Sequence, residues 1–167
     1  MIGLRPVLHL TLDSRKNFLS WYTFFDQSFV ENILNSTLLI AGHDQQSDIS
    51  VEVLLISDEE MKYYTENYGP EPGPTNVLSF PLFSFEEILS FPKTIPLPLG
   101  SILLGVPYIM QEIENFCLKA EAHWARLLIH GMLHLLGYDH VEPKERTTME
   151  TLEAKICTHL GYYWRPL

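Results

Sequence analysis

Hydrophobic and polar positions repeat with two different periods along the chain, and each period predicts one kind of element. Alternating or continuous apolar positions predict short strands over residues 7–12, 49–56 and 101–106, and a fourth over residues 76–80 or slightly beyond. Residues 49–56 are rich in β-branched side chains and are apolar on both faces at their end. We therefore expect them to form an inner strand of a sheet.

A stripe of aromatic residues follows the first strand. Its large apolar side chains recur at steps of three and four residues, which predicts a helix capped by Asp13 or Ser14. The stripe consists of Phe18, Trp21, Tyr22, Phe25, Phe29 and Ile33. We interpret it as core rather than as a base-stacking surface, because stacking residues are more typical of exposed sheets. Residues 38–41 are ambiguous, and residues 42–50 have the composition of a polar loop.

Start and stop signals delimit four further helices. Ser57 and Glu60 form a capping box, Pro107 and Pro143 occupy positions favoured at helix starts, and Gly161 is a stop signal. The expected helices cover residues 57–68, 107–117, 121–136 and 143–160. Each has apolar residues at helical spacing, so each is expected to bury one face.

Prolines dominate the middle of the chain. Seven of the eleven lie between residues 70 and 98, which excludes a regular helix across that span as a whole. We expect a loop region there, interrupted only by the strand at residues 76–80. Residues 84–98 carry phenylalanines and leucines between their prolines, so this part is expected to pack as an ordered flap beside the functional site.

Four strands with helices before, between and after them predict an α+β fold, with a small mixed four-stranded sheet packed against helices. The chain has 167 residues, of which 46% are hydrophobic, and we expect one domain over residues 1–167. No apolar run approaches the ~20 residues that span a bilayer, and the first residues show no charged segment followed by a long apolar stretch, so we expect a cytoplasmic protein without a membrane partner. Cys117 and Cys157 are expected to be small core residues inside helices.

The segment of residues 123–140 contains four of the seven histidines. His130 and His134 are four residues apart, so on a helix they share one face about 6 Å apart along the axis. Gly137 can end that helix in a left-handed turn, which lets His140 approach the same point from outside the helix. Three neutral nitrogen ligands with a fourth position open for water or substrate are typical of a catalytic zinc site.

We therefore predict one Zn²⁺ ion per chain, held by His130, His134 and His140. Nickel, copper and iron also suit such ligands, so other divalent transition metals stay open. His123 lies two helical turns before His130, which is too far to share the ion. The other histidines have no partner by spacing.

The spacing is that of metzincin proteases, whose helix carries a glutamate directly after the first histidine as general base. That position is Gly131 here, so a metzincin-like metallopeptidase is a minor alternative. The full run His130-Gly-Met-Leu-His-Leu-Leu-Gly-Tyr-Asp-His140 instead resembles the YbeY family of metal-dependent, single-strand-specific endoribonucleases. A second family-like segment, Pro74-Thr-Asn-Val-Leu-Ser-Phe-Pro81, lies upstream.

The resemblance implies a hydrolase that cuts single-stranded RNA, with a ribosomal RNA precursor as substrate, acting in 16S rRNA 3′-end maturation and ribosome quality control. The small ribosomal subunit is the implied partner, and no DNA is expected. Two positions depart from the family. Its arginine before the upstream segment falls at Gly69, and the acid of its Gly-Asp pair falls at Ser101. These changes favour one alternative, a metal-stabilised ribosome assembly factor that does not cut RNA.

Two further residues are candidates for catalysis. Asp139 can orient a histidine, act as base toward the water, or cap the turn after Gly137. Arg126 lies one turn before His130 and is the cation nearest the metal in sequence, so it either holds a flanking phosphate or forms a surface ion pair with Glu121 or Glu114.

The formal net charge of −10 taken alone argues against nucleic-acid binding, because phosphate contacts usually require a basic surface. Basic residues do gather locally: Arg5, Arg15 and Lys16 near the start, and Lys119 and Arg126 before the histidines. They leave open a local basic patch, with an ordinary solvated surface as the alternative.

Overall fold

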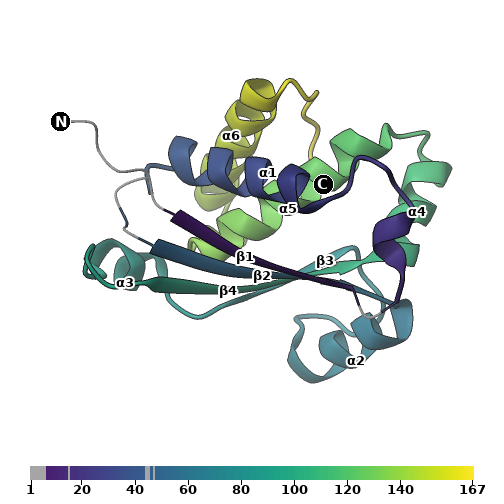
Figure 1. The fold of residues 1–167 in the computed structure, drawn as a ribbon, viewed down its shortest axis with the longest axis horizontal. Coiled ribbons are helices and arrows are strands. Elements are labelled where there is room, and N and C mark those ends of the chain that lie inside the picture. Colours follow the sequence, from purple (N-terminus) through teal and green to yellow (C-terminus); the bar gives the residue numbers. More distant parts are fainter. Residues whose placement is uncertain (1–6, 15, 44–45, 47) are drawn as a thin grey trace.

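A four-stranded mixed sheet forms the centre of the protein (Figure 1). The computed structural model describes residues 7–14, 16–43, 46 and 48–167. The strands are β1 (Val7–Ser14), β2 (Asp48–Ile56), β3 (Val77–Pro81) and β4 (Leu97–Gly105), in the order β1-β2-β4-β3. β1, β2 and β4 run parallel, and the edge strand β3 pairs antiparallel with β4. The α+β class with a small mixed sheet is confirmed.

Helices cover the sheet unequally. They are α1 (Gln27–Ile40), α2 (Asp58–Tyr68), α3 (Phe85–Ser90), α4 (Val106–Asn115), α5 (Ala120–Leu135) and α6 (Pro143–Leu160), with a short 3₁₀ turn at Phe18–Ser20. Figure 1 shows α1, α5 and α6 on one side of the sheet and α2 on the other. No helix in the described part of the chain is both long and apolar enough to cross a bilayer.

The inner strand β2 explains this layering. Its residues Ile49, Val51, Val53 and Leu55 point into the main core beneath α1 and α5. Leu54 and Ile56 point the other way and form a second cluster with Met61 of α2 and Leu103 of β4. The end of β2 is therefore apolar on both faces because both faces are buried there, as the sequence predicts for an inner strand.

The helix expected over the aromatic stripe is displaced in the structure. α1 begins at Gln27, and its cap is Asp26, whose side chain accepts the backbone N–H of Phe29 at 2.8 Å; Asp13 and Ser14 lie within β1. Phe18 and Phe25 precede the helix but are buried in the core, whereas Trp21 is 48% exposed. The aromatic spacing therefore comes mostly from a connection wrapped over the core, and the predicted helix start was wrong.

The strand β4 begins four residues before its expected start. A register shift opposite Ser50 and Val51 leaves Leu99 as an extra residue, and Gly100 adopts a φ of +128°. This bulge places Leu97 and Leu99 on the same face as Ile102 and Leu104, which breaks the simple alternation. The expectation of a strand from residue 101 was therefore too short.

Two further local expectations need correction. The flap of residues 84–98 contains a six-residue helix, α3, opened by a capping box between Ser84 and Glu87. Cys117 lies beyond the end of α4 with a φ of +50° and is exposed, so of the two cysteines only Cys157 is a core residue. The remaining helices, α2, α4, α5 and α6, begin and end within about two residues of their expected positions.

Candidate metal centre

The helix α5 places His130 and His134 side by side. Their Nε2 atoms are 3.1 Å apart and their ring centroids 4.6 Å apart, at the spacing expected for one helical turn. α5 is held firmly because eleven of its sixteen residues are buried, including Trp124, Leu128 and Leu133. Both imidazoles are partly buried, so they lie at the edge of this rigid helix rather than on a mobile loop.

Gly137 turns the chain back toward the helix. Its φ is +92°, and the backbone N–H groups of Gly137 and Tyr138 donate to the carbonyls of His134 and Leu133, which closes the end of α5. Glycine is required for a second reason, because a Cβ at this position would lie 2.5 Å from the backbone nitrogen of Phe85. The predicted left-handed turn is confirmed, and it returns His140 to the histidine pair.

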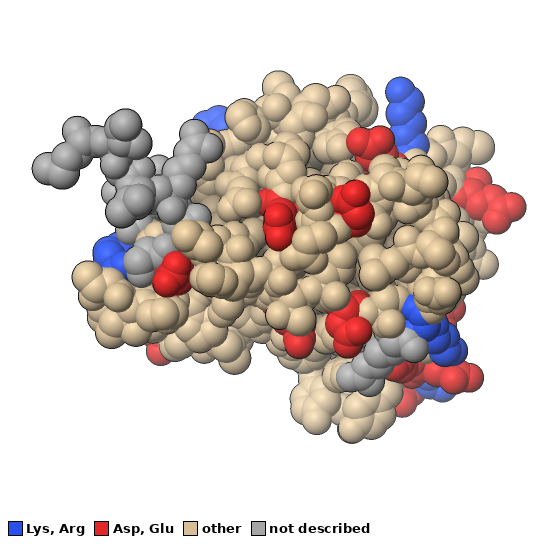
Figure 2. Space-filling view, in the orientation of Figure 1, with Lys and Arg blue, Asp and Glu red and all other residues tan. Residues whose placement is uncertain are grey.

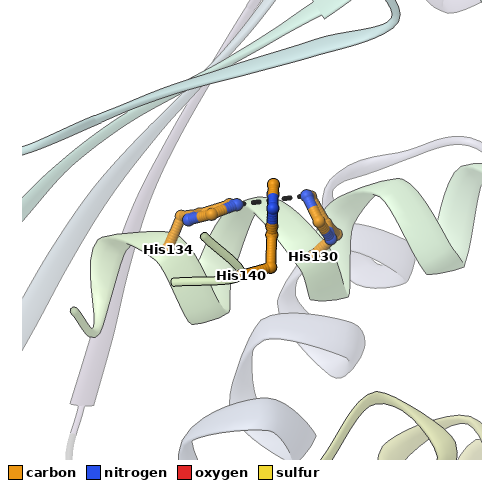
Figure 3. Close-up of side chains that lie close together, drawn as sticks. All are labelled: His130, His134 and His140. Carbon is orange, nitrogen blue, oxygen red and sulfur yellow. Dashed lines mark hydrogen bonds between the residues drawn. The ribbon is translucent and has the colours of Figure 1, made fainter. Parts of the chain in front are cut away.

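The three histidines converge on one point (Figure 3). The ring centroid of His140 lies 5.4 Å from that of His130 and 4.9 Å from that of His134. One ligating nitrogen from each ring lies within 4.8 Å of the others, and within the described ranges no other group of three such side chains does so. Three imidazole nitrogens at this spacing suit a single transition-metal ion with a coordination position left open.

Gly131 occupies the position at which metzincin proteases carry their glutamate base, and the structure leaves little room for a side chain there. A Cβ at this position would lie 2.8 Å from Cγ2 of Ile102 and 3.2 Å from Oγ of Ser79, so residue 131 faces the sheet. The hydroxyl of Ser79 donates to the carbonyl of Gly131 at 3.2 Å, which ties β3 to the metal helix. A larger side chain at residue 131 would therefore disrupt the packing of α5 on the sheet.

A carboxylate from α6 orients His130, and sequence reasoning missed it. Glu153 Oε1 accepts a hydrogen bond from Nδ1 of His130 at 2.7 Å, and its Oε2 accepts from Nε1 of Trp164 at 3.2 Å. Glu153 is only 5% exposed. Because a carboxylate only accepts, the proton of a neutral His130 lies on Nδ1 and its Nε2 keeps the lone pair that a metal needs.

The second histidine is held in its neutral form. Burial, followed by the charges of His130 and His140, lowers the pKa of His134 from 6.5 to about 4. Asp139 and a hydrogen bond to the backbone of Tyr138 act in the opposite direction. A neutral imidazole is the form that binds metal, so His134 is ready to bind at neutral pH.

Asp139 lies in the turn between His134 and His140. Its Oδ1 accepts the backbone N–H of His140 at 2.7 Å, as expected of a turn-capping aspartate. The side chain is exposed, and it borders a cavity of about 610 Å³ next to His134, together with Tyr138 and Phe85. The roles of Asp139 as base or as orienting group stay predictions.

The structure encloses Arg126 in the core, in contact with His123. It is 5% exposed; its Nη2 lies 2.8 Å from Nδ1 of His123, and its Nη1 donates to the carbonyl of Arg165 at 3.3 Å. Burial is the main cause that lowers its pKa. Neither expectation for Arg126 fits this position, because a guanidinium enclosed in the core is available neither to a phosphate nor to a surface glutamate.

Arg126 instead completes a buried polar chain. Nε2 of His123 lies 2.8 Å from Oε2 of Glu112, and the amide of Asn76 donates to both oxygens of Glu112 at 3.1 and 3.2 Å. Asn76 belongs to the upstream segment Thr-Asn-Val-Leu-Ser-Phe-Pro. That segment therefore contributes to packing between β3, α4 and α5.

The two positions that depart from the family pattern line neither of the two cavities that border the metal-site histidines. Gly69 is the residue that ends α2. Ser101 of β4 donates to Oε1 of Glu52 at 2.9 Å, on a shallow cavity of about 310 Å³ that Phe80 and Thr11 also line. A glutamate from β2 thus provides a carboxylate beside the position where the family has an acid.

Basic side chains do not gather on the face drawn in Figure 2. In the part of the chain that the structure describes, Lys and Arg lie at the edges of that face, with acidic residues between them. Arg5 and Arg15 lie outside the described residues, and Arg126 is buried. Of the two alternatives that the sequence leaves open, a local basic patch therefore gains no support from Arg126.

Comparison of the sequence with known proteins identifies one family whose match includes the three histidines. A sequence profile of the family described as endoribonuclease YbeY matches residues 15–161. Proteins named endoribonuclease YbeY from Legionella pneumophila (strain Paris) and Pseudomonas putida (strain W619) are 37% identical over 135 residues and 36% identical over 123 residues. These alignments cover 79% and 74% of this chain and 81% and 75% of the relatives.

A solution structure of a Thermotoga maritima protein has the same fold, with a TM-score of 0.55 at 21% identity, over 93% of this chain and 92% of the other. The profile match extends from the residue after β1 to the residue after α6, and so includes all three histidines. The chain therefore belongs to the YbeY family.

Proposed function

We propose that this protein is a metal-dependent endoribonuclease that cleaves single-stranded RNA. The observation that carries the proposal is the convergence of His130, His134 and His140, with His130 oriented by Glu153, in a chain matched over most of its length by proteins named endoribonuclease. Oriented neutral imidazoles are typical of catalytic metal sites, and an open coordination position is what hydrolysis needs.

The residues of the chain would share the work as follows. A zinc ion in such a site lowers the pKa of water and polarises a phosphoryl oxygen. His134, neutral through burial, and His130, oriented by Glu153, would supply nitrogen lone pairs to the ion. Asp139 is the exposed carboxylate at the mouth of the site, and we propose that it accepts the proton of the attacking water.

The aromatic lining of the cavity of about 610 Å³ beside His134 favours a single-stranded RNA substrate over a duplex. Phe83, Phe85 and Tyr138 line it, and the rings of Phe85 and Tyr138 meet edge to face with centroids 5.4 Å apart. Unpaired bases can bind such aromatic surfaces, whereas bases within a duplex cannot reach them. A pocket of this volume is in the range of ordinary small-ligand sites.

The finer assignment follows from family membership and is part of the proposal. We infer that the metal is zinc, that the substrate is a ribosomal RNA precursor at the 16S 3′ end, that the small ribosomal subunit is the partner, and that the protein acts in the cytoplasm. Three nitrogen ligands suit zinc, although availability also decides which metal is bound.

A non-cleaving role in ribosome assembly is the second candidate. It is favoured by Gly69 and Ser101, which remove a cation and an acid that the family pattern contains. A metallopeptidase is less well supported, because residue 131 is a glycine that faces the sheet and provides no general base.

One experiment separates these functions. Purified protein is incubated with end-labelled single-stranded RNA, the same RNA annealed to its complement, and an unstructured protein, each with zinc and with a chelator. Zinc-dependent cutting of the single strand alone, lost in His134→Ala, is the expected result. Binding of RNA without cutting would replace the proposal by the assembly role, and cutting of the protein substrate by the peptidase role.

A further inference from the structure

Arg146 lies beside the metal centre. It belongs to α6, whereas Arg126, the cation nearest the histidine ligands in sequence, belongs to α5. Arg146 is on the first turns of α6, and its Nε donates to the carbonyl oxygen of His140 at 3.4 Å. Arg146 lines a cavity of about 190 Å³ together with the metal ligands His130 and His140. Its side chain is exposed, in contrast to that of Arg126.

The donors of Arg146 are arranged for an anion. A guanidinium has five N–H donors in a rigid fork; the contact to His140 uses one of them and leaves the four on the Nη atoms. In the part of the chain that the structure describes, Arg146 is the only Lys or Arg lining this cavity, and it takes part in none of the ion pairs found there. A positively charged fork is therefore held next to the metal ligands with most of its donors free.

The cavity limits what this fork can bind. A volume of about 190 Å³ is below the ~300 Å³ at which small-molecule sites usually begin, so a nucleoside does not fit, whereas a phosphate group does. A backbone phosphate at a metal centre gains negative charge as it is attacked, and a fixed cation stabilises that charge. Arginine binds phosphate oxygens with two parallel hydrogen bonds, which also fixes the orientation of the phosphate.

Two acidic side chains, those of Glu150 and Glu153, line this cavity, as does the last residue of the chain, Leu167. Both oxygens of Glu153 already accept hydrogen bonds, from His130 and Trp164, which partly offset its negative charge. Glu150 is partly exposed and repels an anion. A phosphate is therefore expected on the side of the cavity formed by Arg146 and the histidines.

We propose that Arg146 holds a backbone phosphate of single-stranded RNA directly beside the metal centre, in the cavity that it forms with His130 and His140. This inference rests on the proposed function, because it assumes an RNA strand at the metal. It assigns to Arg146 the role of the cation that the family pattern has near Gly69.

The test measures RNA binding rather than cleavage. A labelled single-stranded oligoribonucleotide is titrated with metal-loaded protein at several salt concentrations, and its length is checked on a denaturing gel afterwards. Arg146→Ala is expected to weaken binding about tenfold at low salt and to reduce the slope of log K against log salt by about 0.7, the value for one phosphate contact on a single strand. Arg146→Lys is expected to restore the slope, because the charge is kept.

Two further variants make the test specific. Lys155→Ala removes a cation from the same helix that lines a different cavity, and it is expected to leave the slope unchanged. Glu150→Gln removes the repelling charge and is expected to strengthen binding. Metal content, measured by elemental analysis, should equal that of the wild type in all four variants.

The inference is overturned if Arg146→Ala keeps the wild-type affinity and slope, or if it loses metal, since Arg146 would then serve only to hold His140. Its failure is distinguishable from failure of the proposed function. Wild-type protein that binds RNA but does not cut it refutes the nuclease, while the salt slopes of the variants still decide the role of Arg146.

Discussion

Replacing Glu153 by glutamine tests whether the metal site depends on its buried carboxylate. Glu153 accepts from Nδ1 of His130 at 2.7 Å and from Nε1 of Trp164 at 3.2 Å. Glutamine has nearly the same shape, but its amide has one accepting oxygen and one donating nitrogen. Glu153→Gln therefore keeps one of the two hydrogen bonds. At the other position, the N–H group of the glutamine faces the N–H donor of His130 or Trp164.

The size of the effect follows from this arrangement. Whichever way the amide is turned, either His130 or Trp164 faces an N–H group, and His130 also loses the negative charge that increases the basicity of its Nε2. Loss of such an orienting partner typically lowers metal affinity by about 10- to 100-fold, which corresponds to about 1.4–2.7 kcal/mol. The fold should persist, because the substitution creates no cavity.

Zinc affinity can be measured by competition with a chromophoric chelator at neutral pH. Glu150→Gln is the matched control, because it removes a negative charge from the same cavity without removing a hydrogen bond to a ligand histidine. We expect less than about a twofold change for the control. Wild-type affinity in Glu153→Gln would refute the reasoning, and an equal loss in both variants would attribute the effect to overall charge rather than to the hydrogen bond.

Three other predictions follow from the same geometry. Gly137→Ala should destabilise the protein by several kcal/mol and Gly161→Ala by only about 1–2, measured by urea unfolding, because both glycines have positive φ but only a Cβ at residue 137 meets Phe85. The metal-free protein should lose up to about 3 kcal/mol of stability as the pH falls from about 6.5 to about 4. In this window His134 binds a proton in the unfolded chain but stays neutral in the folded protein, so protonation favours unfolding. A free energy of unfolding that does not change across this window would contradict the lowered pKa. Asp139→Asn should keep the turn and the metal but slow RNA cleavage about 100-fold or more, and an unchanged rate would leave Asp139 as a turn residue only.

Local signals in the sequence predicted much of the fold. The capping box of Ser57 and Glu60, the proline at the start of α6 and the glycine at its end all act within one or two helical turns, and the structure has each of them in the predicted place. The spacing of the histidine ligands is equally local, because one helix and one turn position them. Such features depend on short-range geometry, which the sequence contains directly.

The features that were missed depend on contacts between distant segments. The bulge at Gly100 is defined by its pairing with β2, and the place of the aromatic residues before α1 is defined by the core that they cover. Glu153 lies 23 residues after His130, on another helix. Its one signal in the sequence is a carboxylate on the apolar stripe of α6, in phase with Met149 and Ile156, where a charge needs a specific partner.

The helix α5 carries polar residues of two kinds. His123 and Arg126 belong to a structural network, whereas His130 and His134 belong to the candidate metal site. His123 and Arg126 are enclosed by Glu112 and a backbone carbonyl, so most of their polar atoms have partners within the protein. His130 has the carboxylate of Glu153 on Nδ1, and its Nε2 lies 3.1 Å from Nε2 of His134, at the point where the three imidazoles converge. Ring nitrogens that converge on one point at the partly exposed side of a helix can turn their lone pairs to an ion there, whereas those of His123 are taken up inside the protein. The same reasoning explains why Arg126, the cation nearest in sequence, serves packing, while Arg146, with most of its donors free, is suited to bind substrate.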